Sequence, residues 1–111
     1  MTTAVAVHDD VTVLSVVGEI DLATAPALET AIEGVLAETP RAVIIDLTGV
    51  GFLASAGMAA LVAAHKRAGT ATTIAVVAEG PATSRQLKMT ALDQVFALYA
   101  TLDEALAALR S

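Results

Sequence analysis

The sequence predicts a single α/β domain, residues 1–111, with a mainly parallel mixed sheet of about five strands and about four helices. Three observations predict this fold class. The length suits one compact domain with a buried core. Hydrophobic residues make up 56% of the chain and only 3% is aromatic, which indicates an aliphatic core. Finally, β-type runs alternate with helical segments, and that order implies right-handed crossovers between parallel strands.

The first part of the chain predicts two strands and a helix. Residues 4–7 and 11–17 are β-type runs separated by a turn-like triplet at residues 8–10, and we expect the first strand to be antiparallel at an edge. Thr24 is the expected N-cap of the helix, with Pro26 in its first turn. Apolar residues at i, i+4, i+7 and i+8 form its predicted buried face: Leu28, Ile32, Val35 and Leu36.

The middle of the chain predicts a central strand followed by a second helix. Residues 42–47 are apolar except for Asp46, which is typical of a strand covered on both faces and makes a structural role for this carboxylate the expected one. Residues 48–54 contain two glycines and predict a loop. A helix is expected to begin near Ser55 and to end at Gly69 after two basic residues. Its predicted buried residues are Met58, Leu61, Val62 and His65.

The last third predicts two more strands and two more helices. Residues 73–77 and 95–99 are the expected strands, and residues 80–88 the expected short helix between them. Thr101 and Glu104 have the spacing of a capping box, which predicts the start of the final helix. The predicted buried face of that helix is Leu102, Leu106 and Leu109.

Charge and composition exclude several function classes. Twelve acidic against six basic residues give a net charge of −6, so neither nucleic acid nor a membrane surface is an expected partner. The absence of cysteine excludes disulfides, thiolate nucleophiles and cysteine-based zinc sites. Residues 47–64 are uncharged but interrupted by glycines, so we interpret them as core rather than as a membrane span. Without a secretion signal at residues 1–10, the expected location is the cytoplasm.

Three stretches carry a resemblance to a known family. They are residues 18–26 (GEIDLATAP), residues 45–58 (IDLTGVGFLASAGM) and residues 101–109 (TLDEALAAL). In this order they resemble the STAS domains of bacterial anti-sigma factor antagonists, and the likeness spans nearly the whole chain. The middle stretch is the most specific of the three.

The resemblance implies a partner-switching phosphoprotein that regulates transcription, for example in a stress response. Members of the family bind an anti-sigma factor with a serine-kinase fold and so release its sigma factor. The kinase phosphorylates a serine at the start of the second helix, which breaks the complex, and a serine phosphatase restores it. Ser55 matches this serine, and Asp21 matches an acidic residue near it. The expected partner-binding residues are Asp21, Gly49, Gly51, Leu53, Ala54, Ser55, Ala56, Gly57 and Met58.

The residue types fit this chemistry, with one departure. A serine at a helix start faces unpaired amides and the positive end of the helix dipole, which would stabilise a phosphate. The family usually has an acidic residue before this serine and a hydroxyl residue after it, where this chain has Ala54 and Ala56. Two alternatives therefore stay open, a phosphorylated switch and a constitutive antagonist. Of the flanking side chains, Phe52 and Met58 are expected to pack inward.

The same residues allow other interpretations. Ser55 could simply cap the helix, and Asp21 could cap a turn. The same fold could serve as an interaction subunit of a lipid-transport ATPase or of a stress-signalling complex. A small serine hydrolase would need a base beside Ser55, but His65 is ten residues further along the helix, about 15 Å away. Gly49 and Gly51 lack the Lys-Ser/Thr of a P-loop. We therefore expect no enzyme activity, cofactor or metal.

Overall fold

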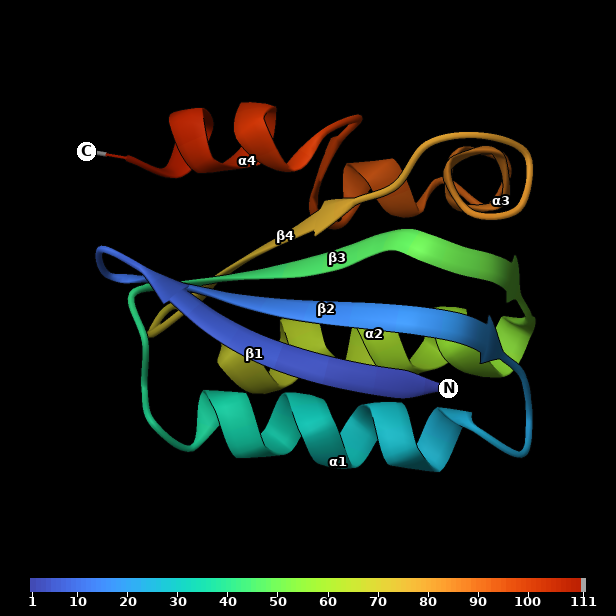
Figure 1. Cartoon of the computed structure of the whole chain (residues 1–111), viewed down its shortest axis with the longest axis horizontal. Coiled ribbons are helices and arrows are strands. Elements are labelled where there is room, and N and C mark those ends of the chain that lie inside the picture. Colours follow the sequence, from blue (N-terminus) through green and yellow to red (C-terminus); the bar gives the residue numbers. More distant parts are fainter. Residues whose placement is uncertain (111) are drawn as a thin grey trace.

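The computed structural model describes residues 1–110, and within that range strands and helices alternate as the sequence predicts (Figure 1). The strands are β1 (Thr2–His8), β2 (Val11–Ile20), β3 (Ala42–Leu53), β4 (Thr73–Val77) and β5 (Ala97–Tyr99). The helices are α1 (Ala25–Leu36), α2 (Ser55–Ala68), α3 (Ser84–Met89) and α4 (Leu102–Leu109), with a 3-10 turn at Leu92–Gln94.

The strands form one sheet in the order β1-β2-β3-β4-β5. Only the β1–β2 pair is antiparallel, with Thr2 opposite Val17 and His8 opposite Val11, and the remaining neighbours are parallel. The tight β1–β2 turn places Asp9 at a φ of 58°, in the left-handed region that aspartate tolerates better than most residues. The predicted mixed, mainly parallel sheet with an antiparallel edge strand is confirmed.

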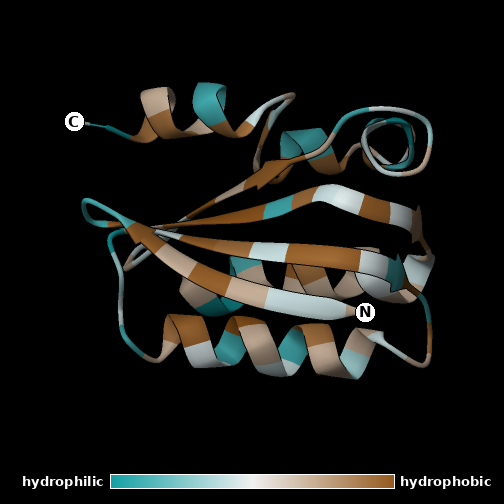
Figure 2. Ribbon diagram, viewed as in Figure 1, coloured by the Kyte–Doolittle hydropathy of each residue, from teal (hydrophilic) through white to brown (hydrophobic). Residues whose placement is uncertain are grey.

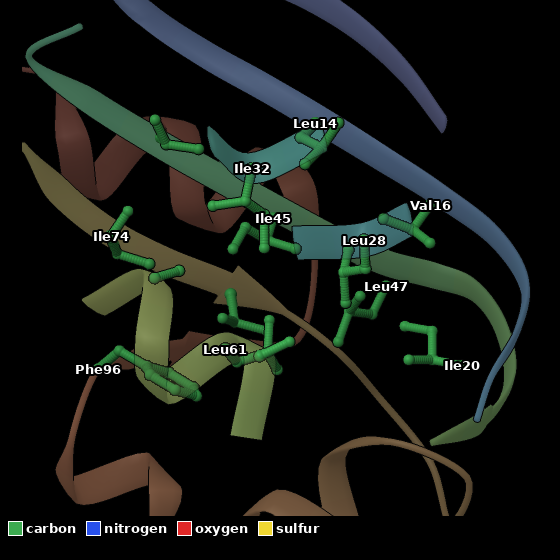
Figure 3. Close-up of a cluster of buried hydrophobic side chains, with 14 of the residues drawn as sticks. Leu14, Val16, Ile20, Leu28, Ile32, Ile45, Leu47, Leu61, Ile74 and Phe96 are labelled. Atoms are coloured by element: carbon green, nitrogen blue, oxygen red, sulfur yellow. The ribbon is translucent and has the colours of Figure 1, made fainter. Parts of the chain in front are cut away.

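Helices cover both faces of the sheet, and the core is aliphatic as predicted. α1 and α2 lie together on one face, where the larger buried cluster fills the space between helices and strands (Figures 1 and 3). Leu14 and Ile45 from the strands, with Ile32 and Leu61 from the helices, are among its members. α4 covers part of the opposite face through Ala105 and Leu106. The hydropathy of the residues agrees with this arrangement. The strands are mostly hydrophobic, and α1 alternates between hydrophobic and hydrophilic residues (Figure 2).

The prediction of a loop at residues 48–54 is wrong, because β3 continues to Leu53. Its pairing with β2 shifts twice. Ser15 lies opposite Asp46 while Val17 lies opposite Gly49, and Gly18 lies opposite Val50 while Glu19 lies opposite Phe52. At each shift β3 carries one residue more than β2, which is the signature of a β-bulge. The glycines that suggested a loop thus belong to a bulged strand.

Several predicted boundaries in the last third also differ. α3 begins at Ser84 rather than at residue 80, because Gly80 has a φ of 96° and residues 80–83 form a turn closed by the hydrogen bond from Arg85 N to Gly80 O (3.1 Å). The last strand is limited to Ala97–Tyr99, since the 3-10 turn and the loop after it take up the preceding residues. The predicted start of α4 is confirmed, with Thr101 as its N-cap accepting from Glu104 N, which is one of the two hydrogen bonds of a capping box.

The buried face of α2 also differs from the predicted one. Leu61 is buried, but Met58, Val62 and His65 are only half-buried. The buried residues are mostly small: Gly57, Ala60, Leu61, Ala64 and Ala68. Small side chains allow α2 to lie close to the sheet and to α1, so burial follows the approach of the helix rather than side-chain hydrophobicity. Within residues 1–110, no helix is long and apolar enough to cross a bilayer.

Candidate docking site at the start of α2

The carboxyl ends of β2 and β3 meet the first turn of α2 at one end of the sheet (Figure 1). Ile20 lies opposite Leu53 in the last pair of these strands, and Ala54 N donates to Ile20 O (2.8 Å). The chain then turns into α2 with Ala54 as the N-cap, at φ −85° and ψ 169°. The β2–α1 loop, which begins at Asp21, therefore lies beside the start of α2.

Ser55 is the first residue of α2 and is exposed. It is not the helix cap, so the interpretation of this serine as a capping residue is wrong. The cap is Ala54, whose side chain makes no hydrogen bond, and its carbonyl accepts from Gly57 N (3.0 Å) and Met58 N (3.1 Å). The amides of Ser55 and Ala56 have no intrahelical partner. With no acidic residue in the first turn, this helix start can accommodate an anion.

Asp21 organises the loop beside this helix start. Its Oδ1 accepts hydrogen bonds from the amides of Ala23 and Thr24, both at 3.0 Å. Thr24 is the N-cap of α1, as predicted, but its hydroxyl accepts from Asp21 N (2.9 Å) and donates to Glu19 O (2.9 Å) rather than capping the helix. The turn-capping interpretation of Asp21 is confirmed. The hydrogen bond from the Thr24 amide is the main cause that lowers the pKa of the Asp21 carboxyl. Desolvation, the next largest effect, opposes it, and the Thr24 hydroxyl and the Ala23 amide lower the pKa further.

Two of the predicted partner-binding residues face inward. Leu53 is 4% exposed, and Gly57 is buried against β2 and β3. A side chain at position 57 would place its Cβ 2.7 Å from Leu53 Cδ1 and in conflict with Ile20 Cγ2. Leu53 and Gly57 thus fix the first turn of α2 against the sheet instead of offering a contact surface.

The remaining predicted contact residues lie at or near the surface. Gly49 and Gly51 are exposed on the bulged half of β3, while Ala54 and Ala56 are half-buried on either side of Ser55. At Gly49 a Cβ would lie 2.9 Å from Val17 Cγ2, so a larger residue would not fit without a shift of that side chain.

The apolar side chains around this surface are only partly as predicted. Met58 packs against the core as expected. Phe52 was predicted to pack inward, but it is 50% exposed, because the second bulge changes the side of β3 on which it lies. Leu22, in the loop after β2, is 82% exposed and is not among the predicted contact residues. A leucine inside a turn, where packing does not require it, is the sequence signal that could have identified it.

The polar groups that could have indicated other chemistry lie elsewhere. Asp46 is almost fully buried and accepts from Thr48 N (3.0 Å), which agrees with its predicted structural role. His8 is at the end of the sheet opposite Ser55, because its partner Val11 pairs with Ala42 at the start of β3. Among residues 1–110, no three His, Cys, Asp or Glu side chains are grouped as metal ligands.

Comparison with known proteins gives consistent matches along the chain. Residues 2–105 match the model of the STAS domain. The chain is 46% identical over 110 residues to the anti-sigma-F factor antagonist RsfB of Mycobacterium tuberculosis, covering 99% of this chain and 90% of the relative. The crystal structure of an anti-sigma factor antagonist from Mycobacterium paratuberculosis superimposes with a TM-score of 0.95 at 53% identity, covering 99% of this chain and 94% of its own.

A more distant match concerns the fold alone. The Bacillus cell fate determinant SpoIIAA, solved in its phosphorylated form, has a TM-score of 0.68 at 16% identity. The superposition covers 98% of this chain and 100% of that protein.

Proposed function

Because the chain belongs to the STAS domain family, and because relatives at 46% and 53% identity are anti-sigma factor antagonists, we propose that it is one too. As a single STAS domain in the cytoplasm, it binds an anti-sigma factor and so frees the sigma factor that this partner holds. The observation that carries the proposal is Ser55, exposed at an uncapped and uncharged helix start. Gly49, Gly51 and the half-exposed Phe52 lie on the part of β3 that leads to this helix start. A surface with an uncharged centre suits a protein contact.

The proposal includes control of the contact by phosphorylation of Ser55. A phosphate there carries nearly two negative charges and is stabilised by the free amides and the dipole of α2, so the domain keeps its fold. A carboxylate on the partner about 5–6 Å away is then repelled by roughly 3 kcal/mol per charge pair at an effective dielectric near 20. One such pair weakens binding by about a hundredfold.

The kinase is proposed to be the anti-sigma factor itself, with a serine phosphatase reversing the reaction. Ala54 offers no carboxylate that could orient the Ser55 hydroxyl, so the hydroxyl must be positioned by the helix start and by the kinase alone. Incubation with the cognate anti-sigma factor and ATP, followed by intact-mass and peptide mass spectrometry, tests this step. Phosphate on Ser55 supports the switch, and no phosphate there would leave a constitutive antagonist.

The docking proposal is tested by a pair of variants at Ser55. Ser55→Ala should bind the anti-sigma factor nearly as well as the natural chain, because it removes only the hydroxyl. Ser55→Asp should bind about a hundredfold more weakly, because it places a carboxylate at the contact centre. Thr70→Asp adds the same charge at an exposed position beyond the other end of α2 and should leave binding unchanged. Equal affinity of the two Ser55 variants, measured by calorimetry, would contradict the proposal.

A further inference from the structure

The exposed side of α3 carries two cations beside a large apolar side chain. Arg85 and Lys88 are three residues apart and Met89 is four residues from Arg85, so all three lie on one side of the helix. All are exposed, Met89 by 71%. With Gly80, Pro81 and Ser84 they border a shallow hollow of about 480 Å³. The helix itself is fixed from its other side by Leu87, which is fully buried in the core.

Among residues 1–110, no carboxylate forms an ion pair with Arg85 or Lys88. Within residues 1–110 the ion pairs are Arg41 with Asp10 and Arg67 with Glu33, and neither involves α3. The exposed side of α3 contains no acidic residue. In a chain with a net charge of −6, two adjacent unpaired cations form a local patch of opposite sign. Such a patch attracts an acidic surface and raises the rate of encounter with it.

This patch continues from the proposed docking site. Thr90, directly after α3, places its hydroxyl 3.6 Å from Met58 Sδ. Met58 is three residues from Ser55 and therefore on the same side of the first turns of α2. Figure 1 shows α3 at the end of the molecule where β3 ends and α2 begins. Met58 and Thr90 thus connect the start of α2 with the end of α3, so a partner that is seated on Ser55 and extends in this direction reaches α3.

We infer that Arg85, Lys88 and Met89 form a second contact of the docking surface, and that they receive an acidic segment of the anti-sigma factor. Carboxylates of that segment pair with Arg85 and Lys88, and an apolar side chain covers Met89. The inference rests on the proposed function, since it concerns the same partner. It also assigns the two contacts different tasks. The uncharged centre at Ser55 responds to phosphorylation, and the charged patch accelerates and orients the encounter.

Charge reversal on α3 tests the inference. In the Arg85→Glu/Lys88→Glu variant the dissociation constant for the anti-sigma factor should rise at least tenfold at low salt, with most of the change in the association rate. The affinity of the natural chain should fall as salt increases, and that dependence should be weaker in the variant. The control is Lys66→Glu/Arg110→Glu, which changes the net charge equally at two exposed positions outside this patch. The dissociation constant of this control variant should stay within about twofold of that of the natural chain.

The outcomes separate the two proposals. If the natural chain does not bind the anti-sigma factor, the proposed function fails. Suppose instead that the natural chain binds the anti-sigma factor and Ser55→Asp does not. If Arg85→Glu/Lys88→Glu then binds as well as the control Lys66→Glu/Arg110→Glu, the α3 contact alone is wrong. The neutral variant Arg85→Gln/Lys88→Gln removes the attraction without adding repulsion. Its affinity for the anti-sigma factor should therefore lie between those of the natural chain and the charge-reversed variant, and circular dichroism checks that it is folded. Binding of the natural chain to a DNA duplex instead of the anti-sigma factor would overturn the assignment of an acidic protein segment.

Discussion

The first turns of α2 and α4 have the same backbone entry but different chemistry. Both N-caps are extended, with φ and ψ of −85° and 169° at Ala54 and of −133° and 156° at Thr101. At α4 the Thr101 hydroxyl accepts from Glu104 N (3.1 Å), and two acidic residues lie in the first turn. At α2 the cap is an alanine and the first turn has no acidic residue.

The difference separates a helix start that its own residues stabilise from one that they leave uncapped. A capping hydroxyl contributes about 1 kcal/mol, and acidic groups near the N-terminus add a few tenths more. α4 has both, whereas α2 has neither. α2 is fixed instead by packing of Gly57 against Ile20 and Leu53 and by the Ala54–Ile20 hydrogen bond. Its amides stay available because tertiary contacts, rather than caps, hold the helix start.

The largest effect is expected where that packing is broken. Gly57→Ala should lower the free energy of unfolding by about 1–3 kcal/mol, because the new methyl group overlaps Leu53 and the fully buried Ile20. Gly34→Ala in α1 is the matched control, since nothing lies within 4 Å of a Cβ there. It should raise stability by about 0.5–1 kcal/mol through helix propensity alone. Urea unfolding measures both, and equal shifts in the two variants would show that packing does not fix the start of α2.

A smaller effect of opposite sign at the two caps would sharpen the comparison. Ala54→Ser should stabilise the domain by about 1 kcal/mol, because the hydroxyl can accept a first-turn amide in the existing extended conformation. Thr101→Ala should destabilise it by a similar amount. The midpoint temperature of thermal unfolding should therefore rise for Ala54→Ser and fall for Thr101→Ala. The control is Ala59→Ser, at an exposed position inside α2, which should be neutral or slightly destabilising. If Ala54→Ser were no more stable than the natural chain, its free amides would already be satisfied.

The same contrast explains how much the sequence predicts. Local patterns are sufficient for α4, where Thr101 and Glu104 alone identify the cap, and for α1, where Leu28, Ile32 and Val35 mark the buried face. The alternation of elements also predicts the mixed sheet. These features depend on residues close together in the chain, so a pattern of spacing is enough to identify them.

The region around Ser55 depends on pairing with distant residues, and there the prediction is incomplete. The bulges of β3 exist only in its register with β2, so the glycines indicated a loop and Phe52 was predicted to face the wrong way. Burial of Gly57 likewise follows from the approach of α2 to Ile20, which no local pattern contains. The resemblance located Ser55 correctly at the helix start, but the distinction between contact residues and packing residues required the structure.

The smallest expected effect concerns the Asp21 loop beside α2 and depends on pH. The folded-state pKa of Asp21 is lowered by the Thr24 amide first, so its carboxylate stabilises the fold above its unfolded pKa of about 3.9. This contribution is lost as pH falls below that value towards the lower pKa of the folded state. Asp21→Asn keeps an amide oxygen to accept the Ala23 and Thr24 amides but cannot ionise.

The stability difference between the natural chain and Asp21→Asn should therefore be largest near pH 7 and shrink below about pH 4. Asp10, whose pKa is lowered by its hydrogen bond to Arg41, also makes the fold acid-sensitive, but it is present in both chains and cancels in the difference. Urea unfolding at a series of pH values measures this difference directly. A gap that stays constant from pH 7 to pH 3 would mean that Asp21 shapes its loop through hydrogen-bond geometry and not through its charge.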